Sequence, residues 1–368
     1  MTDLFLTGCL RHAPLLETLL GRVAPEGQPA QLPDHALHWT ADLSTPVVIA
    51  DKGQAVPGVL LRVSEEELAR LDYFQGAFGL HLAELQVEAE RGVIEAQVFL
   101  SGPGAEPGPA LEFDAWQAEW GAFMTRVAVE AMGWYGRLGP EGLRSRLRGI
   151  RLRAAARTAI SAHPDRAGHD VTQDVNMIEH RFAYADYFGM EEALLQFRRY
   201  DGSMSAPMAR SCLATGRASV ILPYDPVRDS VLLIEQFRAP LYLGGDPAPW
   251  LWEPIAGMID PGETPEQAAL REAEEEAGVI LSRLETVGAA YSSSGSSMEY
   301  CHLFVGLADL GGAGGVGGLA SEGEDIRSAV ISFDDLMEGI DRHLYRDMPL
   351  LVAGHWLARH RDRLRAES

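Results

Sequence analysis

The sequence predicts a chain of mixed α and β structure that is divided into two domains. Its 368 residues exceed the ~150 residues of a common single domain, and a hydrophobic content of 46% is sufficient for two cores. Short segments with the alternation of strands, and helices with explicit capping signals, occur in both halves. We therefore expect one domain over residues 1–160, a linker over 161–175 and a second domain over 176–368.

Composition narrows the class of partner. The chain has 53 Asp plus Glu against 31 Lys plus Arg, a formal net charge of −22, which disfavours nucleic acid and anionic membranes as partners. Its three cysteines, Cys9, Cys212 and Cys301, lack the spacing of a metal site. The sequence shows no secretory leader and no long apolar run. We therefore expect a protein of the reducing cytoplasm with buried thiols.

The first half begins with a strand at 4–6 and a turn at 7–12, and a second strand follows at 56–63. Ser64 is a good N-cap for a short helix, and Glu67 completes a capping box with it. Alternating segments near 83–100 continue the sheet, and residues 112–159 have helical periodicity. A segment with Pro164 and Gly168 then indicates the linker.

In the second half, residues 223–238 predict a hairpin and a strand, and 250–256 lead into the segment 257–279. A helix begins there after Thr264, the N-cap, because Pro265 suits the first helical position and Gln267 completes a capping box. Gly278 ends the helix. At 3.6 residues per turn, one side carries Leu270, Ala273 and Ala277, and the other carries Glu272, Glu275 and Glu276.

The same segment is strongly acidic. Seven acids against one base, Arg271, give residues 257–279 a net charge of −6. Like charges one turn apart destabilise a helix, and a bound divalent cation would remove that repulsion. Because every candidate ligand is an oxygen, the segment predicts Mg²⁺, with Mn²⁺ as an alternative, rather than a thiolate zinc site. The simpler alternative is a solvated acidic face.

The spacing of this segment resembles the Nudix box. Gly257, Glu263, the pair at 271–272, the pair at 275–276 and the glycine at 278 fit its pattern without a gap, although Ala273 is small for its apolar position. The resemblance implies an α/β/α sandwich, carboxylate-bound Mg²⁺, and hydrolysis of a nucleoside diphosphate linked to another group.

Around the box, the chain resembles the ADP-ribose pyrophosphatases of the Nudix superfamily. The resemblance implies that Arg238, Glu253 and Gly257 help to hold the substrate. It implies a metal shell and a catalytic set as well. The implied metal ligands are the carbonyl of Ala256, Glu272, Glu276 and Glu324, and the implied catalytic residues are Arg271, Glu275, Glu322 and Glu324. An ordinary surface arginine is the alternative for Arg238.

A glycine-rich stretch at 311–318 precedes Ser-Glu-Gly-Glu-Asp-Ile at 321–326 and predicts a flexible arm that ends in carboxylates. The resemblance makes Glu322 the favoured catalytic base and Glu324 a metal ligand or the alternative base. Incidental acids at a loop tip are the other interpretation.

Recognition of the adenosine end depends on two upstream sites. By resemblance, Tyr187 or Phe188 would stack on adenine, and Arg210 would cover its other face by a cation–π contact. An aromatic pair in a core is the alternative. Fifteen residues beyond the box, Ser294 stands where the family tends to have proline, although Glu299 keeps the acidic position that follows.

The first half resembles the gamma-glutamylcyclotransferase-like fold, a small β-barrel with helices. Thr7-Gly8-Cys9-Leu10 takes the place of the family's Tyr-Gly-Ser/Thr-Leu, and Gln75 stands where the family has its catalytic Glu. An amide cannot exchange a proton at neutral pH, so we expect the fold without the chemistry. The two-domain combination resembles the tellurite-resistance Nudix proteins, but no residue explains the handling of tellurium.

These observations favour an enzyme, an ADP-ribose diphosphatase that acts on a small nucleoside diphosphate sugar. The alternatives are a hydrolase of another nucleoside diphosphate sugar and a non-catalytic sensor of nucleotide sugars. By analogy with related ADP-ribose pyrophosphatases, we expect a homodimer formed through residues near 180–220.

Overall fold

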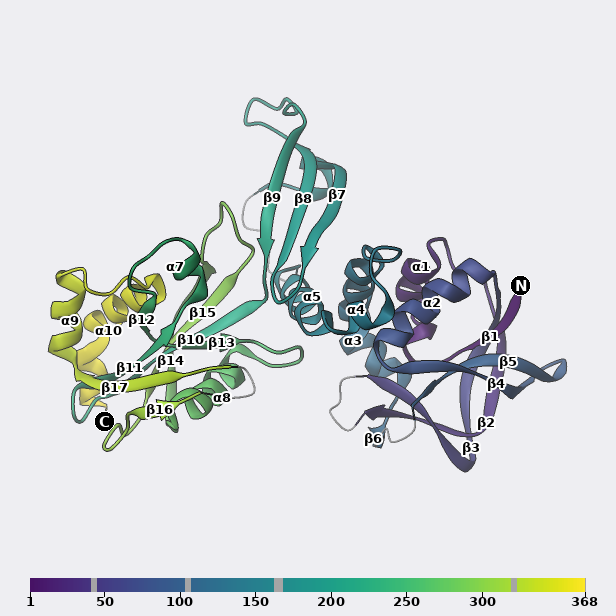
Figure 1. The fold of residues 1–368 in the computed structure, drawn as a ribbon, viewed down its shortest axis with the longest axis horizontal. Helices are drawn as coiled ribbons and strands as arrows, with labels where there is room; N and C mark the ends of the chain where they lie inside the picture. The colour runs from purple at the N-terminus through teal and green to yellow at the C-terminus, as the bar shows by residue number, and fades with distance from the viewer. Residues whose placement is uncertain (41–44, 103–106, 162–167, 319–322, 368) are drawn as a thin grey trace. The chain divides into compact units, whose positions relative to one another are not determined.

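A computed structural model describes residues 1–40, 45–102, 107–161, 168–318 and 323–367 (Figure 1). By its internal contacts the chain divides into two compact units, Met1–Leu213 and Ala214–Ser368. Residues 176–213, which the sequence placed with the second domain, therefore group with the first unit. The linker predicted over 161–175 stays a prediction, because residues 162–167 lie outside the described ranges. Within those ranges, none of the helices has the length and apolar character needed to cross a membrane.

The first unit contains a closed barrel, as predicted. Its strands run in the order β3-β1-β5-β4-β2, and β2 also pairs with β3, which closes five strands into a ring. Phe5, Leu32 and Val98 fill its interior, as inward-facing residues do in small barrels. A sixth strand, β6, extends β2. The strands are β1 (Thr2–Leu6), β2 (Gln28–Thr40), β3 (Pro46–Val63), β4 (Leu80–Ala89), β5 (Gly92–Ser101) and β6 (Pro107–Ala110).

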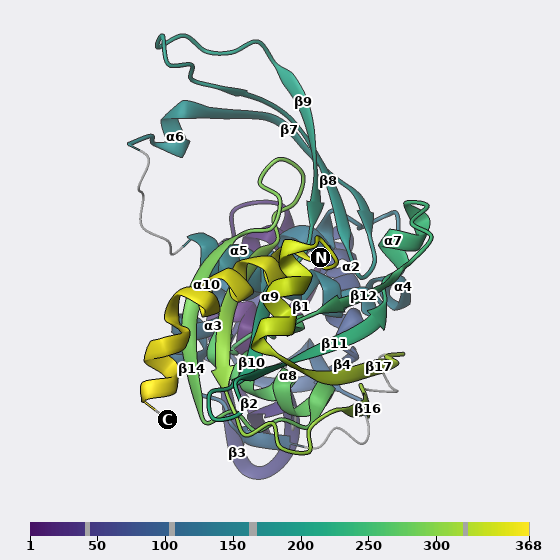
Figure 2. The ribbon, with the colours of Figure 1, turned by 90° about the vertical axis from the view of Figure 1, so that its left-hand side faces the viewer.

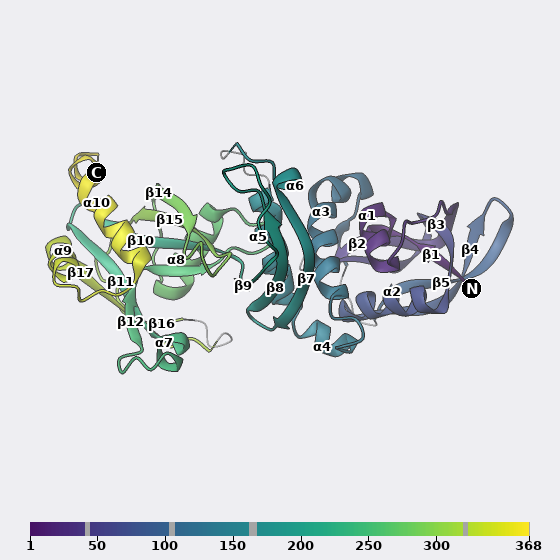
Figure 3. The same cartoon turned by 90° about the horizontal axis from the view of Figure 1, so that it is seen from above.

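Helices cover this barrel and share a second core with it (Figure 3). The short helix predicted after Ser64 is present, and its capping box with Glu67 is formed. Trp116 and Phe123, both buried, belong to that core and lie on the longest helix of the unit. The helices are η1 (Gly8–Arg11), α1 (Ala13–Leu20), α2 (Glu65–Ala77), α3 (Phe113–Met132), α4 (Pro140–Arg144), α5 (Leu147–Ser161) and α6 (Val171–Asp174).

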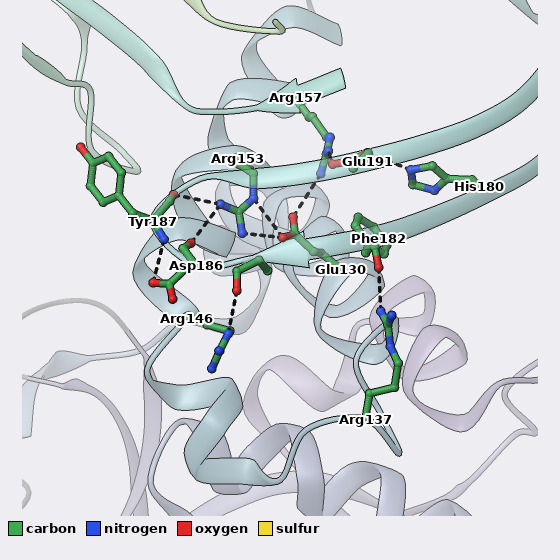
Figure 4. A network of polar contacts seen from close by, with 11 residues as sticks. Glu130, Arg137, Arg146, Arg153, Arg157, His180, Phe182, Asp186, Tyr187 and Glu191 are labelled. Carbon is green, nitrogen blue, oxygen red and sulfur yellow. Dashed lines mark hydrogen bonds and ion pairs between the residues drawn. The ribbon is translucent and has the colours of Figure 1, made fainter. Parts of the chain in front are cut away.

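A separate three-stranded sheet completes the first unit, with the strands β7 (Val175–Ala185), β8 (Gly189–Phe197) and β9 (Met208–Ala214) in that order. Arginines from the helical layer donate hydrogen bonds to main-chain carbonyls at the end of β7 and in the turn after it (Figure 4). Arg137 reaches the carbonyl of Phe182 at 2.8 Å, and Arg146 reaches that of Ala185 at 2.7 Å. These donors satisfy carbonyls of an edge strand.

A buried ion pair lies at the centre of the same contact. The side chains of Arg153 and Glu130 are 0% and 2% exposed, and Nη2 of the arginine lies 2.6 Å from Oε1 of the glutamate. Arg157 Nη1 reaches the other oxygen at 3.3 Å, and Arg153 Nη1 also donates to the carbonyl of Tyr187 at 3.2 Å. The pair therefore joins α3, α5 and the β7–β8 turn.

We predict that Glu130→Gln destabilises the first unit by about 3–5 kcal/mol, because it leaves Arg153 without its counter-charge in a buried site, whereas Arg157 keeps its pair with Glu191. Native-state hydrogen exchange of α3 and α5 measures this as a fall in protection. Glu192→Gln is the matched control, since Glu192 pairs with Arg181 on an exposed face and its loss should change stability by under about 1 kcal/mol. Equal protection in both variants would contradict the prediction.

The second unit is an α/β/α sandwich, as predicted. Its sheet runs β14-β15-β10-β11-β17-β16, with β13 paired to β10 and β12 paired to β11. Helix α8 packs on one face with Ile221 and Phe304, and α9 and α10 pack on the other with Leu222 and Val305 (Figure 2). Its elements are β10 (Arg217–Asp225), β11 (Ser230–Phe237), α7 (Ala239–Leu243), β12 (Trp250–Glu253), β13 (Ile255–Met258), α8 (Pro265–Ala277), β14 (Arg283–Tyr291), β15 (Tyr300–Leu307), β16 (Gly315–Gly317), β17 (Ile326–Ser332), α9 (Phe333–Asp341) and α10 (Met348–Ala366).

Helix α8 has the ends that the sequence predicts, because Thr264 and Gln267 form the capping box and Gly278 adopts the left-handed conformation at φ 62°. The predicted division of its faces was wrong in two places. Leu270 is 46% exposed, whereas Glu276 is only 3% exposed. The buried side is made of Ala268, Ala269 and Ala273, since small side chains let the helix lie close to the sheet.

Candidate active site

The site is built where β13 passes under α8. Gly257 lies so close to the helix that a Cβ atom added to it would be 1.8 Å from Oε1 of Glu272. One residue earlier, the main-chain N–H of Ala256 donates to Oε2 of Glu276 at 3.3 Å. The glycine of the motif is therefore required by this close approach, and β13 and α8 present their groups to one another.

Arg271 holds several of the acids around it. Its Nε and Nη2 donate to Glu263 at 3.0 and 2.9 Å, and its Nη1 donates to Glu272 at 2.6 Å and to Glu275 at 3.1 Å. A further bond reaches the carbonyl of Met258 at 3.1 Å. The hydrogen bond to Glu263 is the largest cause that raises the pKa of Arg271. The arginine thus fixes the loop before the helix to the turn of the helix that carries Glu272 and Glu275.

Two carboxylates of α8 lie in surroundings that disfavour their charge. Burial, opposed by Arg271, raises the pKa of Glu272. Burial, together with the charges of Glu272 and Glu324, raises the pKa of Glu276 to about 9. Acids that repel one another in a desolvated place are stabilised by a bound cation. The electrostatics therefore distinguish this cluster from a solvated acidic face.

The donor chemistry of this cluster fits Mg²⁺, because hard divalent ions prefer carboxylate and carbonyl oxygens. As the side chains stand, no three His, Cys, Asp or Glu groups among the described residues converge closely enough to hold a metal ion. Glu272 is instead paired with Arg271. The residues that would hold the ion are Glu272, Glu276, Glu324 and the carbonyl of Ala256.

Arg238 and Glu253, which the sequence predicts to hold the substrate, form an ion pair, and their role in binding stays a prediction. Nε and Nη2 of Arg238 lie 2.8 and 2.7 Å from Oε1 of Glu253, whose residue is 6% exposed. Burial raises the pKa of Glu253, and Arg238 opposes that shift. Sequence reasoning missed a third member, Asp347, which caps α10 through the N–H of Leu350 at 2.8 Å and acts electrostatically on both partners. An acid before Met-Pro signals a helix start in the sequence, but nothing there links it to Arg238.

The late loop is only partly described. Glu322 lies outside the described residues, so its predicted role as base stays a prediction. Glu324 is described, and its charge acts on both Glu272 and Glu276. The structure thus brings Glu324 to the carboxylates of α8, as a metal-ligand role requires.

The residues predicted to recognise the base, Tyr187, Phe188 and Arg210, belong to the first unit. The rings of Tyr187 and Phe188 lie 4.9 Å apart, edge to face, and are 53% and 40% exposed. Arg210 lines a surface hollow on the three-stranded sheet beside Arg181, and the lining of that hollow includes neither ring. Glu299 lies in the second unit before β15 and acts on Cys301. Their roles in binding stay predictions.

The first unit has a small cavity at the position predicted for the cyclotransferase site. Thr7, Gly8, Cys9 and Gln75 belong to its lining, and the space open to water is about 20 Å³, little more than one water molecule needs. Gln75 is 3% exposed and bonds to Cys9, whose pKa is raised to about 12 by burial. The cavity contains no described carboxylate in its lining.

Comparisons with known proteins find a different family in each half of the chain. The NUDIX domain model matches residues 214–348, and the model of gamma-glutamyl cyclotransferase, AIG2-like, matches residues 4–118. The chain is 38% identical to an ADP-ribose pyrophosphatase of Escherichia coli K12 over 194 residues, which are 53% of this chain and 92% of that protein.

Two further relatives cover the same part of the chain. An ADP-ribose pyrophosphatase of Haemophilus influenzae is 38% identical over 44% of this chain and 76% of its own length. A GDP-mannose pyrophosphatase of Cronobacter sakazakii is 30% identical over 47% of this chain and 90% of its own length. The chain therefore belongs to the Nudix hydrolases, in the family of the ADP-ribose pyrophosphatases, and carries an N-terminal domain of the gamma-glutamyl cyclotransferase, AIG2-like family.

Proposed function

We propose that the second unit hydrolyses the diphosphate of ADP-ribose, with Mg²⁺, to AMP and ribose 5-phosphate. Water adds to one phosphorus, the bridging P–O bond breaks, and the other phosphate leaves with the bridging oxygen. The observation that carries the proposal is the group of Glu272, Glu276 and Glu324, which repel one another around the buried side chain of Glu276 and which Arg271 only partly neutralises.

The residues divide the work. When bound, Mg²⁺ neutralises the diphosphate and lowers the pKa of the attacking water, and Glu272, Glu276, Glu324 and the carbonyl of Ala256 would hold it. Arg271 orients Glu272 and Glu275 through its bonds to both. Glu322 removes the proton of the water, and Glu324 is the alternative base.

A second set of residues holds the substrate. Arg238, fixed by Glu253, donates to a phosphate oxygen, and Gly257 lets the substrate approach the main chain. Glu299 accepts from a hydroxyl of the substrate. At the adenosine end, Tyr187 or Phe188 stacks on the base and Arg210 covers it. A homodimer in the cytoplasm is the expected state, which sedimentation at two concentrations tests.

A second nucleoside diphosphate sugar is the runner-up substrate, and the GDP-mannose pyrophosphatase among the relatives supports it. A non-catalytic sensor is disfavoured, since a sensor does not need the acids of α8 and Glu324 together. The deciding experiment assays the full chain with Mg²⁺ against ADP-ribose, GDP-mannose, UDP-glucose, NADH and dinucleoside polyphosphates. An added phosphatase frees phosphate from the phosphomonoester products but not from the intact diphosphates. Preference for ADP-ribose in kcat/KM supports the proposal, and preference for another substrate replaces it.

We predict that the first unit releases no 5-oxoproline from gamma-glutamyl amines, because an amide at Gln75 cannot exchange the required proton. Gln75→Glu is the discriminating variant. Gain of activity would show a pocket disabled at one group. If the small cavity around Cys9 excludes the substrate, Gln75→Glu should remain without cyclotransferase activity. Activity in the unmodified chain would show that the catalytic residue lies elsewhere.

A further inference from the structure

Beyond the start of α8, the sheet of the second unit carries a cation and three rings on one face. Arg217 of β10 lies in register with Tyr300 of β15, and Tyr300 is the cross-strand partner of Tyr291 on β14. His302 is two residues along β15 and therefore faces the same side. Because Ile221 and Phe304 on this side contact α8, the four residues occupy the catalytic face. We call them the tyrosine ledge.

Helix α8 covers the sheet as far as Ser219 and leaves the tyrosine ledge uncovered. The hydroxyl of Ser219 donates to the carbonyl of Pro265, the first residue of the helix, at 2.9 Å, and Ser219 is fully buried. Two residues further out on β10, Arg217 is only partly buried, and Tyr291 is 45% exposed. The ledge is therefore accessible to a ligand.

Arg217 has no counter-charge among the described residues. Burial lowers the pKa of its guanidinium, and no carboxylate of the described residues opposes that shift. Its guanidinium makes neither an ion pair nor a hydrogen bond within the described part of the chain. A partly desolvated charge without a partner is costly. Acceptor oxygens from a ligand would remove this cost, and a guanidinium offers five donors in a fixed fork.

The ledge is also close to the catalytic carboxylates. Ser219 is the strand partner of Gly257, which touches Glu272. Arg217 lies two residues from Ser219 along β10, and Gly257 lies one strand spacing away on β13. These spacings place the Cα atoms of Arg217 and Gly257 about 8 Å apart. A group attached directly to a diphosphate at Gly257 can reach that far.

Ring geometry selects the kind of group. The rings of Tyr291 and Tyr300 lie 5.0 Å apart at 77°, and those of Tyr300 and His302 lie 5.4 Å apart at 74°. Edge-to-face rings do not form the parallel-walled slot in which a flat base stacks. They do present ring edges on the strand beside Arg217, while the hydroxyl of Tyr300 donates to the carbonyl of Ala289 on β14 at 3.3 Å. The donors of Arg217 suit the several hydroxyls of a sugar.

We propose that the tyrosine ledge binds the sugar of the nucleoside diphosphate sugar, with Arg217 donating hydrogen bonds to its hydroxyls and Tyr300 contacting its ring. This inference rests on the proposed function and assigns the ledge as a specificity determinant of that reaction. It leaves the base to residues elsewhere.

The test uses the full chain with Mg²⁺ and three substrates. ADP-ribose and ADP-mannose differ in the sugar and in the sugar carbon that carries the diphosphate, whereas ADP-mannose and GDP-mannose differ only in the base. Arg217→Met keeps the aliphatic stem and removes the donors. Arg283→Met is the matched control, because Arg283 lies on β14 but is paired with Glu285 and Glu367.

Arg217→Met should raise KM for ADP-ribose roughly tenfold, the worth of a lost charged hydrogen bond, with kcat nearly unchanged, as expected for uniform binding. The ratio of KM between ADP-mannose and GDP-mannose should stay that of the wild type. An unchanged KM for ADP-ribose would overturn the proposal. A change in the ratio of KM between ADP-mannose and GDP-mannose would overturn it as well. Tyr300→Leu repeats the test if thermal melting shows that Arg217→Met is unfolded. If the wild type itself hydrolyses none of the three, the proposed function fails, a result that is visible before any variant is measured.

Discussion

Glu276→Gln should lower turnover of the favoured substrate by on the order of 10²- to 10³-fold, the loss that follows when one preorganised charged group is removed from an active site. Glu276 is 3% exposed, and the charges of Glu272 and Glu324 act on it. Gln keeps the shape of the side chain and can still accept the N–H of Ala256. The fold should therefore be retained while the metal site loses a charged ligand.

Stability without metal should move in the opposite direction. Because Glu276 is buried beside two other acids, its replacement by a neutral amide removes repulsion. Thermal melting in the presence of a chelator should show a Glu276→Gln protein at least as stable as the wild type. The addition of Mg²⁺ should stabilise the wild type more than the variant, since only a ligand that binds the native state raises its stability.

Glu274→Gln is the matched control for this variant. Glu274 lies on the same helix and has the same charge, but it is exposed and takes a position of the motif that any residue can fill. Its replacement should leave turnover near that of the wild type. Unchanged turnover of Glu276→Gln at saturating substrate and limiting Mg²⁺ would contradict the assignment of Glu276 as a ligand.

The site was predictable where local sequence determines geometry. Thr264, Gln267 and Gly278 specify where α8 begins and ends, and the spacing of the acids follows from the helix itself. The distribution of its faces was less predictable. Periodicity alone shows that Ala273 and Leu270 share a side, but the close approach of β13 at Gly257 decides that alanines are buried and Leu270 is not.

The rest of the site and fold depends on contacts between residues far apart in the sequence, which limited its prediction. Asp347 is about 100 residues from Arg238 and Glu253 in the sequence, and only the packing of α10 on the sheet brings the three together. Similarly, the three-stranded sheet attaches to the first unit because Arg137 and Arg146 bind main-chain carbonyls. A carbonyl leaves no trace in the sequence, so such contacts cannot be predicted from residue types.

Glu322→Gln should lower kcat by roughly 10²- to 10⁴-fold with little change in KM, because a positioned base accelerates the chemical step and contributes little to binding. The glutamate follows a glycine-rich arm, and its neighbour Glu324 acts on the carboxylates of α8. The measurement is a comparison of kcat and KM for ADP-ribose at saturating Mg²⁺.

Glu324→Gln separates the two roles of this loop. If Glu324 is a metal ligand, its loss should raise the Mg²⁺ concentration that gives half-maximal rate, since one carboxylate no longer stabilises the ion beside Glu272 and Glu276. Glu322→Gln should leave that concentration unchanged, because a base that acts on water does not hold the ion. If Glu324→Gln abolishes turnover at every Mg²⁺ concentration while Glu322→Gln retains it, then Glu324 is the base and the two assignments are reversed.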